Sequence, residues 1–255
     1  MKRLATNELA VFALAVQFLT RIPVPVGNAF SPARLAATPR YYPLVGVIIG
    51  VLCAAVHSLA LACLSPAVAI LLAVGAGLLI TGGFHEDGLA DTFDGLGGAD
   101  RDQTLEIMRD SRIGTYGTLA LVLILGTKIA ALVDLAPGRV AMAFIVAHSL
   151  SRLSAVLVIA SSRYVRDHGI GKPTADGIGV GSLAVALLTG ALLLVWFAFA
   201  AGTAETLTVL AGALLGHVAM RALFERRLGG YTGDTLGAVQ QTSELGVYLG
   251  LLSWQ

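Results

Sequence analysis

Residues 82–98 read GGFHEDGLADTFDGLGG, and this acidic stretch begins where a long apolar segment ends. The preceding residues 66–80 contain no charged side chain. A helix of about 20 apolar residues is long enough to span a bilayer. Apolar residues alternate with the acids inside the stretch, so the pattern predicts an amphipathic helix that continues from a membrane span.

Apolar segments of similar length recur along the whole chain. Hydrophobic residues make up 56% of the 255 residues and charged residues only 13%, whereas soluble domains carry about 25% charged residues. A buried helix of a soluble protein would account for one such segment, but not for several in so short a chain. We therefore predict an all-α fold, a polytopic integral membrane helical bundle in which residues 1–255 form one membrane-embedded catalytic domain. The predicted spans are residues 42–64, 66–84, 117–135, 140–160, 182–201 and 206–224.

Two further segments are apolar but less typical of a span. Residues 236–254 contain Gln240, Gln241 and Glu244, which weaken the apolar signal. Residues 9–19 are too short to cross a bilayer easily, and no cleavage site of a signal peptide follows them. We expect about six to seven transmembrane helices in total, plus an N-terminal interfacial helix.

Basic residues collect in alternate connections between the predicted spans. The positive-inside rule places such connections in the cytoplasm, which predicts a multi-pass protein of the inner membrane whose acidic motif faces the cytoplasm. Single basic residues scattered over short loops do not fit a nucleic-acid-binding surface. The basic residues are Arg21, Arg34 and Arg40, then Arg101, Arg109 and Arg112, then Arg163, Arg166 and Lys172, and finally Arg221, Arg226 and Arg227.

The acidic motif has the composition of a metal site. Eight of the sixteen acidic residues lie between positions 86 and 110. Asp87, Asp91 and Asp94 are spaced i, i+4 and i+7, so a helix would present them on one face. Like charges near a membrane repel each other, and a divalent cation removes this conflict. Carboxylate oxygens suit Mg²⁺ or Mn²⁺, so the motif predicts a site for one of these divalent metals; a solvated acidic loop is the plain alternative.

Two more motifs border predicted spans. Residues 108–117, MRDSRIGTYG, carry Arg109 and Arg112, whose guanidinium groups suit bidentate contacts with phosphate. Ordinary basic flanking of a span explains these arginines equally well. Residues 228–237, LGGYTGDTLG, place backbone amides ahead of a predicted helix, where they can hold a phosphate. A plain turn with an N-cap is the alternative for this second motif.

Ionisable residues that lie deep within the predicted spans include His57, Lys128, His148, Arg152 and His217. Ionisable residues in a membrane are costly and often functional. A lone histidine there is frequently only a hydrogen bond between helices. None of the five is assigned to the site at this point.

The motifs taken together resemble the cobalamin synthase family, also called adenosylcobinamide-GDP ribazoletransferases. The shared elements are residues 85–95, 110–114 and 230–234, and they extend to the N-terminal residues 21–25 and 42–46. The resemblance covers essentially the whole chain. One departure is Arg109, which stands where we expect lysine; the charge is kept but its geometry changes.

The resemblance implies a Mg²⁺-dependent transferase of cobalamin biosynthesis. Such an enzyme joins adenosylcobinamide-GDP to α-ribazole or α-ribazole 5′-phosphate, forms adenosylcobalamin or its 5′-phosphate, and releases GMP. The implied partners are these small molecules and the lipid bilayer, while homo-oligomerisation stays open. By resemblance, the metal ligands are Glu86, Asp87, Asp91 and Asp94, the catalytic candidates are Asp110 and Asp234, and the substrate- or phosphate-binding residues are His85, Gly88, Arg109, Arg112, Gly230, Thr232 and Gly233.

Three other classes of membrane protein share parts of this pattern. A CDP-alcohol phosphotransferase would have arginine at the position of Asp91. An intramembrane prenyltransferase would carry a second aspartate cluster, whereas the second motif here has only Asp234. A transporter would place its acids at mid-membrane on broken helices, not at one rim of the bundle. Nucleotide release from candidate substrates separates the transporter from the enzymes.

Overall fold

A pair of glycines turns the chain sharply at the start of the acidic motif in the computed structural model, which describes residues 2–27, 30–166 and 177–254. Helix α4 (Pro66–Thr81) ends at Gly82 and Gly83, whose φ angles of 70° and 69° are left-handed. Glycine adopts this conformation without the steric cost that a Cβ brings. The next helix, α5 (Phe84–Asp94), is therefore turned by 87° from α4. The acidic motif is helical, as predicted, but it does not continue along the membrane span.

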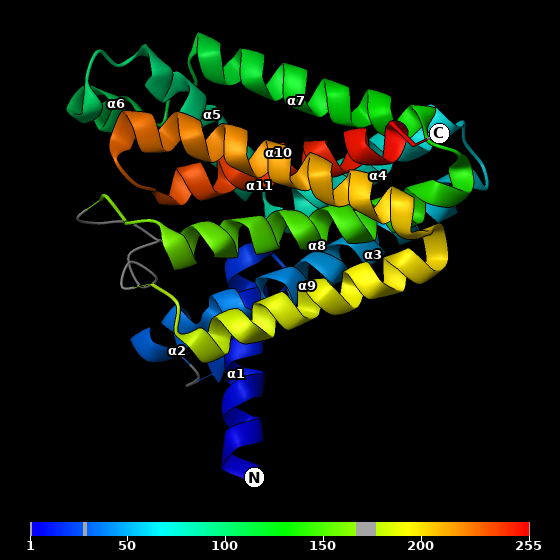
Figure 1. Ribbon diagram of the computed structural model, residues 1–255, viewed down its shortest axis with the longest axis horizontal. Helices are drawn as coiled ribbons and strands as arrows, with labels where there is room; N and C mark the ends of the chain where they lie inside the picture. Colours follow the sequence, from blue (N-terminus) through cyan, green and yellow to red (C-terminus); the bar gives the residue numbers. More distant parts are fainter. Residues whose placement is uncertain (1, 28–29, 167–176, 255) are drawn as a thin grey trace.

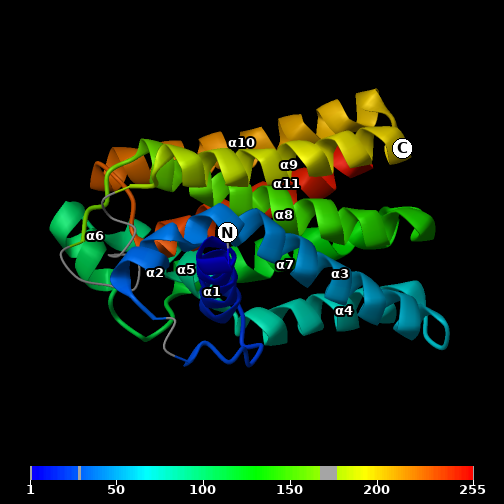
Figure 2. The same ribbon diagram turned by 90° about the horizontal axis from the view of Figure 1, so that it is seen from below.

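The other long helices lie side by side as a bundle (Figures 1 and 2). Short helices and turns close its ends, and α5 runs across one end together with α6. We call this end the acidic end. The bundle helices are α3 (Tyr42–Leu61), α7 (Thr115–Asp134), α8 (Pro137–Ser161), α9 (Val180–Ala201), α10 (Thr203–Leu228) and α11 (Gly233–Leu252), and the short elements are α2 (Pro32–Ala37), η2 (Thr38–Tyr41), η3 (Gly95–Gly97) and α6 (Arg101–Ile107).

Within the described residues, five helical segments are long and apolar enough to cross a membrane. These are Pro32–Leu61, α7, α8, α9 and α10, and the bent pair α4–α5 makes up to six. Each lies at a predicted span, so the all-α polytopic architecture is confirmed. Because α5 lies across the bundle axis, we place it outside the membrane-spanning segments. Lys172 falls outside the described residues.

Helix α11 coincides with the predicted seventh span but does not reach the same apolar threshold. Its polar residues Gln240, Gln241 and Glu244 are buried between the neighbouring helices. A helix that is covered by protein does not meet lipid, so it does not need an apolar surface. The weak hydropathy of this segment therefore reflects an internal position in the bundle.

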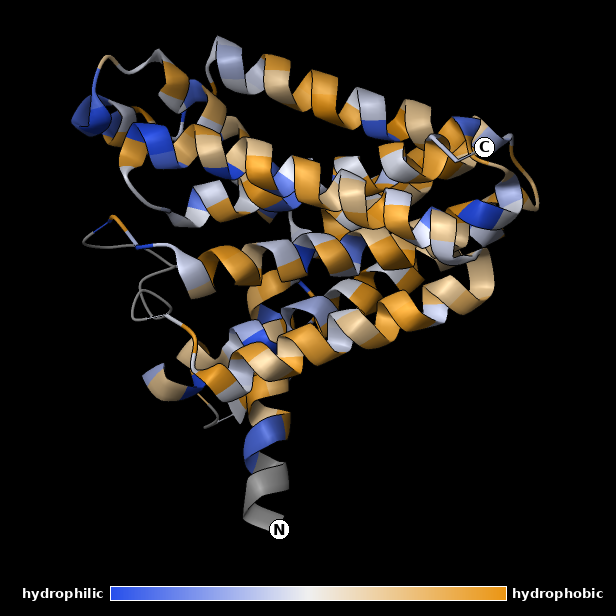
Figure 3. Cartoon of the chain, viewed as in Figure 1, coloured by the Kyte–Doolittle hydropathy of each residue, from blue (hydrophilic) through white to orange (hydrophobic). Residues whose placement is uncertain are grey.

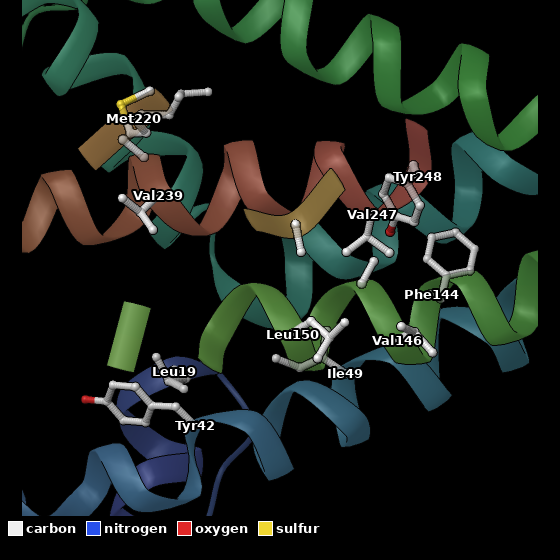
Figure 4. Packing of buried hydrophobic residues seen from close by; sticks show 14 of the residues in the cluster. Leu19, Tyr42, Ile49, Phe144, Val146, Leu150, Met220, Val239, Val247 and Tyr248 are labelled. Atoms are coloured by element: carbon white, nitrogen blue, oxygen red, sulfur yellow. The ribbon is translucent and has the colours of Figure 1, made fainter. Parts of the chain in front are cut away.

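Apolar side chains cover the outside of the bundle as well as its core. Leu79, Leu123 and Phe199 are 78%, 65% and 89% exposed, which suits a lipid environment and not water. Figure 3 shows hydrophobic residues along α7 and α9, and hydrophilic residues over α6 at the acidic end. Inside, Ile49 and Leu150 belong to the core that Figure 4 shows between α3, α8 and α11.

Helix α1 (Lys2–Leu19) leaves the bundle at a steep angle, and Figure 2 shows it nearly end-on. Its residues Asn7–Leu19 are apolar but shorter than a span. Glu8 accepts hydrogen bonds from Arg40 Nη1 (3.0 Å) and from the Tyr41 hydroxyl (2.8 Å). These contacts fix α1 across the entrance to α3, the orientation expected of an interfacial helix.

Two loops are joined at the acidic end by a short backbone bridge. Tyr231 N donates to Arg163 O (2.8 Å), and Val165 N donates to Tyr231 O (3.0 Å). Arg101 Nε also donates to Leu228 O (2.9 Å). The connection after α8 is thereby held against the glycine-rich turn that begins α11.

Candidate active site

The acidic helix α5 crosses the start of α11 at a glycine contact. A Cβ added to Gly88 would lie 2.6 Å from Asp234 O, and one added to Gly237 would lie 2.8 Å from His85 O. Both distances are shorter than side chains permit, so only glycine allows this approach. The predicted backbone approach at Gly88 is present, but its partner is the protein's own α11. The crossing brings the two acidic motifs, far apart in sequence, to one place.

Three aspartates meet at this crossing. Asp87 and Asp91 come from α5, and Asp234 is the second residue of α11. Burial, together with the nearby charges of Asp234 and Asp87, raises the pKa of Asp91 to about 7. Burial also raises the pKa of Asp234, and the Asp87 charge acts in the same direction. The crossing therefore holds carboxylates that resist simultaneous ionisation without a cation.

Arg166 is the positive partner of Asp234. The Arg166 Nη2 and Asp234 Oδ2 atoms are 2.7 Å apart, and the charge of Arg166 opposes the rise in the pKa of Asp234. Apart from this ion pair, Asp234 Oδ2 and Arg166 Nε have no hydrogen-bonding partner among the described residues. Arg166 also donates to Met108 O (3.2 Å). Sequence reasoning had treated Arg166 only as a basic loop residue.

The other two predicted metal ligands turn away from the crossing. Glu86 Oε1 accepts a hydrogen bond from Gln241 Nε2 (2.8 Å) inside the bundle. Asp94 accepts from Gly114 N (2.7 Å) and Gly117 N (2.8 Å) and so caps the start of α7. Among the described residues, no three His, Cys, Asp or Glu side chains gather as a metal site. The predicted four-acid cluster is therefore not assembled as such.

The segment before α7 contains a self-contained ion pair. Arg112 Nη2 lies 2.6 Å from Asp110 Oδ2, and the Arg112 side chain is 87% exposed. This hydrogen bonding holds the pKa of Asp110 at about 2. Arg109 is exposed in the same segment. The structure does not bring Asp110 to the three aspartates, so this geometry does not support the catalytic role predicted for Asp110.

The glycine-rich motif before α11 is a capped turn. Thr232 and Thr235 form a reciprocal capping box, with Thr235 N donating to Thr232 Oγ1 (3.3 Å) and Thr232 N donating to Thr235 Oγ1 (2.9 Å). A Cβ on Gly230 would lie 2.1 Å from Arg163 O, so Gly230 packs against the other loop. The Thr232 hydroxyl and two amides of the predicted phosphate cradle are thus already engaged. Gly233 begins the helix directly beside them.

Two cavities flank the crossing and share Phe18, Phe84 and Asp87. The inner cavity has a volume of about 320 Å³ and is lined mainly by apolar residues. The outer cavity has a volume of about 600 Å³ and a more polar lining that includes Arg21, Glu86, Asp91 and Ser111. The remaining walls of the inner cavity include Leu19, Tyr42, Arg152, Ile159, Arg166 and Leu236. The three aspartates thus lie between an apolar compartment and a polar one.

A buried polar network supports α5 from within the bundle. Lys128 Nζ lies 3.1 Å from Glu244 Oε1 and donates to Gln241 Oε1 (2.6 Å). Gln240 Nε2 donates to Glu244 Oε2 (2.7 Å), and Gln241 passes the chain of hydrogen bonds to Glu86. The side chains of Lys128 and Glu244 are only 4% and 6% exposed. The sequence showed that Lys128 lies inside a predicted span, where a charged residue needs a partner. It did not show that this partner is Glu244, which lies in the weakly apolar segment 236–254.

His85 lies between this network and the inner cavity. Its side chain is buried and stands edge-on to Phe84, with the ring centroids 5.3 Å apart. Burial, together with the positive charge of Arg152, holds the pKa of His85 well below its usual range. The ring lines the inner cavity, so a substrate bound in that cavity could contact His85, as the sequence predicts.

An all-α membrane bundle with aspartates between a polar and an apolar cavity is the arrangement of a membrane-embedded enzyme. Comparison with known proteins makes the assignment specific. The model of the family described as cobalamin-5-phosphate synthase matches residues 11–252, and the chain belongs to this family.

Curated relatives agree over nearly the full chain. The adenosylcobinamide-GDP ribazoletransferase of Shewanella halifaxensis (strain HAW-EB4) is 45% identical over 252 residues, covering 96% of each chain. The protein of the same name from Shewanella woodyi is 45% identical over 257 residues, covering 97% of each. A third, from Leptothrix cholodnii, is 43% identical and covers 97% of this chain and 96% of the relative. No solved structure matches this chain.

Proposed function

We propose that this chain transfers the cobinamide phosphate of adenosylcobinamide-GDP to α-ribazole 5′-phosphate, with release of GMP. The observation that supports this most directly is the α5–α11 crossing, which sets Asp87, Asp91 and Asp234 between the two cavities. A reaction between a polar nucleotide donor and a less polar acceptor needs such an arrangement. The name of the curated relatives contains adenosylcobinamide-GDP and ribazole, and the family description contains cobalamin-5-phosphate, which supports a phosphorylated acceptor.

The reaction is a substitution at phosphorus. A ribose hydroxyl of the acceptor forms a bond to the phosphorus that carries cobinamide, the bond from that phosphorus to the GMP oxygen breaks, and the hydroxyl proton is taken by a base. Asp234 is the candidate base, because it lines the inner cavity at the crossing and burial raises its pKa. Arg166 keeps this carboxylate in place at 2.7 Å.

The residues at the crossing also fit a divalent metal. Asp87 and Asp91 offer hard carboxylate oxygens, and the pKa of Asp91 is raised by its acidic neighbours to about 7. Asp87 and Asp91 would hold Mg²⁺, with Asp234 facing them. When bound, the ion neutralises the diphosphate and stabilises the departing GMP oxygen. Glu86 and Asp94 hold α5 in place through their hydrogen bonds with Gln241 and with the start of α7.

An assay of GMP release tests this proposal. The protein in lipid vesicles receives adenosylcobinamide-GDP and α-ribazole 5′-phosphate, with Mg²⁺ or with EDTA. We expect GMP only with acceptor and Mg²⁺, and a loss of at least about 100-fold in Asp91→Asn. Asp102→Asn is the matched control, because Asp102 undergoes the same change but is 92% exposed on α6. Folded wild type that releases no GMP under any of these conditions would refute the function.

The acidic end is proposed to face the cytoplasm of the inner membrane. Arg101, Arg163 and Arg227 all lie at this end, where Arg101 and Arg227 donate to backbone carbonyls of neighbouring loops. Cytoplasmic loops carry an excess of such residues. This orientation gives a nucleotide donor access from the cytoplasm.

A further inference from the structure

Arg152 is the most deeply buried cation beside the proposed site. It lies on α8 and is 1% exposed. Its Nη1 donates to His148 O (2.9 Å) and lies 3.3 Å from His148 Nδ1. Its Nε has no hydrogen-bonding partner among the described residues. A buried guanidinium with an unused donor is costly, and an anionic ligand would satisfy it.

The charges of Glu244 and Glu86 act on Arg152, but neither carboxylate forms a hydrogen bond with its Nε among the described residues. In the described part of the chain, Arg152 forms no ion pair, because the nearby Glu244 is in contact with Lys128 at 3.1 Å. Arg166, the other arginine of the inner cavity, is paired with Asp234 at 2.7 Å. Arg152 is thus the arginine of the inner cavity that forms no ion pair among the described residues, and its Nε donor is left for a ligand.

The shape and lining of the inner cavity restrict what that ligand is. Its volume of about 320 Å³ is at the lower end for small-molecule sites and is too small for a corrin ring. Leu19, Tyr42, Ile159 and Leu236 provide apolar walls. The flat benzimidazole base of α-ribazole can pack against these walls, because it has no N–H groups that the walls would leave without partners.

We propose that Arg152 is the specificity residue for the 5′-phosphate of the acceptor, which it binds in the inner cavity while the benzimidazole base packs against the apolar walls. This inference rests on the proposed function. The acceptor ribose then lies beside Asp87 and Asp234, which line the same cavity. The donor diphosphate is left to the outer cavity, where Asp91 and Arg21 lie. Arg152 thereby selects the phosphorylated acceptor over free α-ribazole.

The test compares two acceptors in two variants. GMP release is measured with α-ribazole 5′-phosphate and with α-ribazole, for wild type, Arg152→Gln and Arg152→Lys. We expect Arg152→Gln to raise the KM for the phosphorylated acceptor about 10- to 100-fold, as loss of a charge-assisted hydrogen bond implies. The KM for α-ribazole and for the donor should change less than about twofold, and Arg152→Lys should recover part of the discrimination.

A merely structural Arg152 would affect both acceptors alike, so an unchanged ratio of the two kcat/KM values in Arg152→Gln overturns the inference. If that variant does not fold, Arg152→Lys decides in the same way: an intermediate ratio supports the inference and a wild-type ratio rejects it. Ala155→Phe fills the same cavity from the next turn of α8. It should raise the KM for both acceptors and leave their ratio unchanged, and undiminished binding would reject the cavity. Absence of GMP from wild type with either acceptor instead refutes the proposed function itself.

Discussion

Gly88 on α5 lies directly against the backbone of Asp234 on α11, so close that a Cβ at position 88 would stand 2.6 Å from the Asp234 carbonyl oxygen. This contact brings the two acidic motifs together, although positions 88 and 234 are 146 residues apart in the sequence. The geometry of the proposed site therefore depends on a residue that carries no functional group.

Substitution of Gly88 by alanine should reduce activity strongly, because the obstructing atoms belong to backbone and cannot rotate away. We expect kcat to fall at least about tenfold, since small misplacements of reacting groups are costly. Gly126→Ala is the control: Gly126 is also within a helix, α7, but no atom lies within 4 Å of its added Cβ. Equal activities of the two variants in the GMP assay would show that the crossing tolerates a methyl group.

Removal of the Asp94 carboxylate should destabilise the start of α7. Asp94 accepts hydrogen bonds from the backbone of Gly114 and Gly117, and loss of a helix cap costs about 0.5–2 kcal/mol. Asp94→Ala should therefore lower the melting temperature by about 2–5 °C, while Asp102→Ala, which removes an exposed acid, should not. An unaltered melting temperature in Asp94→Ala, measured without metal, would contradict the capping role.

The stability of the metal-free protein should fall as pH rises through the range in which Asp91 titrates. The folded pKa of Asp91 is raised from 3.8 to about 7 by burial and by its acidic neighbours. The unfolded chain therefore releases this proton at lower pH than the folded protein, so stability is lost between about pH 4 and 7. In EDTA, thermal melts should show a decrease of about 2–4 °C over this range.

Mg²⁺ should oppose that decrease, because it stabilises the ionised carboxylates. Asp91→Asn removes the titrating group and should flatten the pH dependence in EDTA. A pH dependence identical in wild type and Asp91→Asn would mean that other groups control it.

The buried pair of Lys128 and Glu244 should behave as one unit. The two side chains are 3.1 Å apart and almost fully buried, and removal of one partner of such a pair costs about 3–5 kcal/mol. We expect Lys128→Met and Glu244→Gln each to destabilise strongly, whereas the double variant should be less destabilised than the sum of the two. Additive effects in a double-mutant cycle would show that the pair is not coupled.

Cysteine labelling from either side of the membrane should verify the orientation of the bundle. Cys63 is exposed in the connection between α3 and α4, at the opposite end of the bundle from α5 and α6 (Figures 1 and 2). In intact cells, an impermeant thiol reagent should label Cys63 but not a cysteine introduced as Asp102→Cys on α6. The inverse pattern would place the acidic end outside the cytoplasm.

Hydropathy predicted the helical bundle and most of its spans, because lipid-facing helices such as α9 must be apolar along their length. It marked α11 as less typical of a span, since Gln240, Gln241 and Glu244 are buried within the bundle and their cost is offset by partners on other helices. Those partners cannot be known before the helices are packed.

Spacing predicted the site only in part. The i, i+4, i+7 rule identified Asp87 and Asp91 as neighbours on α5 and also included Asp94, which α7 recruits instead. Asp110 pairs within its own loop, and Arg166 reaches Asp234 through a backbone bridge between two loops. The contacts of Asp94 with α7 and of Arg166 with Asp234 join distant segments, and such contacts leave no periodic trace in the sequence.

The double-glycine turn after α4 also determines how the protein meets its substrates. Because α5 lies across the end of the bundle, its carboxylates lie near the membrane surface and not in a channel through the lipid. Under the proposed function, the bulky, hydrophilic corrinoid nucleotide would react without entering the bilayer, and only the small flat base of the acceptor would enter between the helices. For such an enzyme, the membrane is a surface on which two substrates are joined, and neither substrate has to cross it.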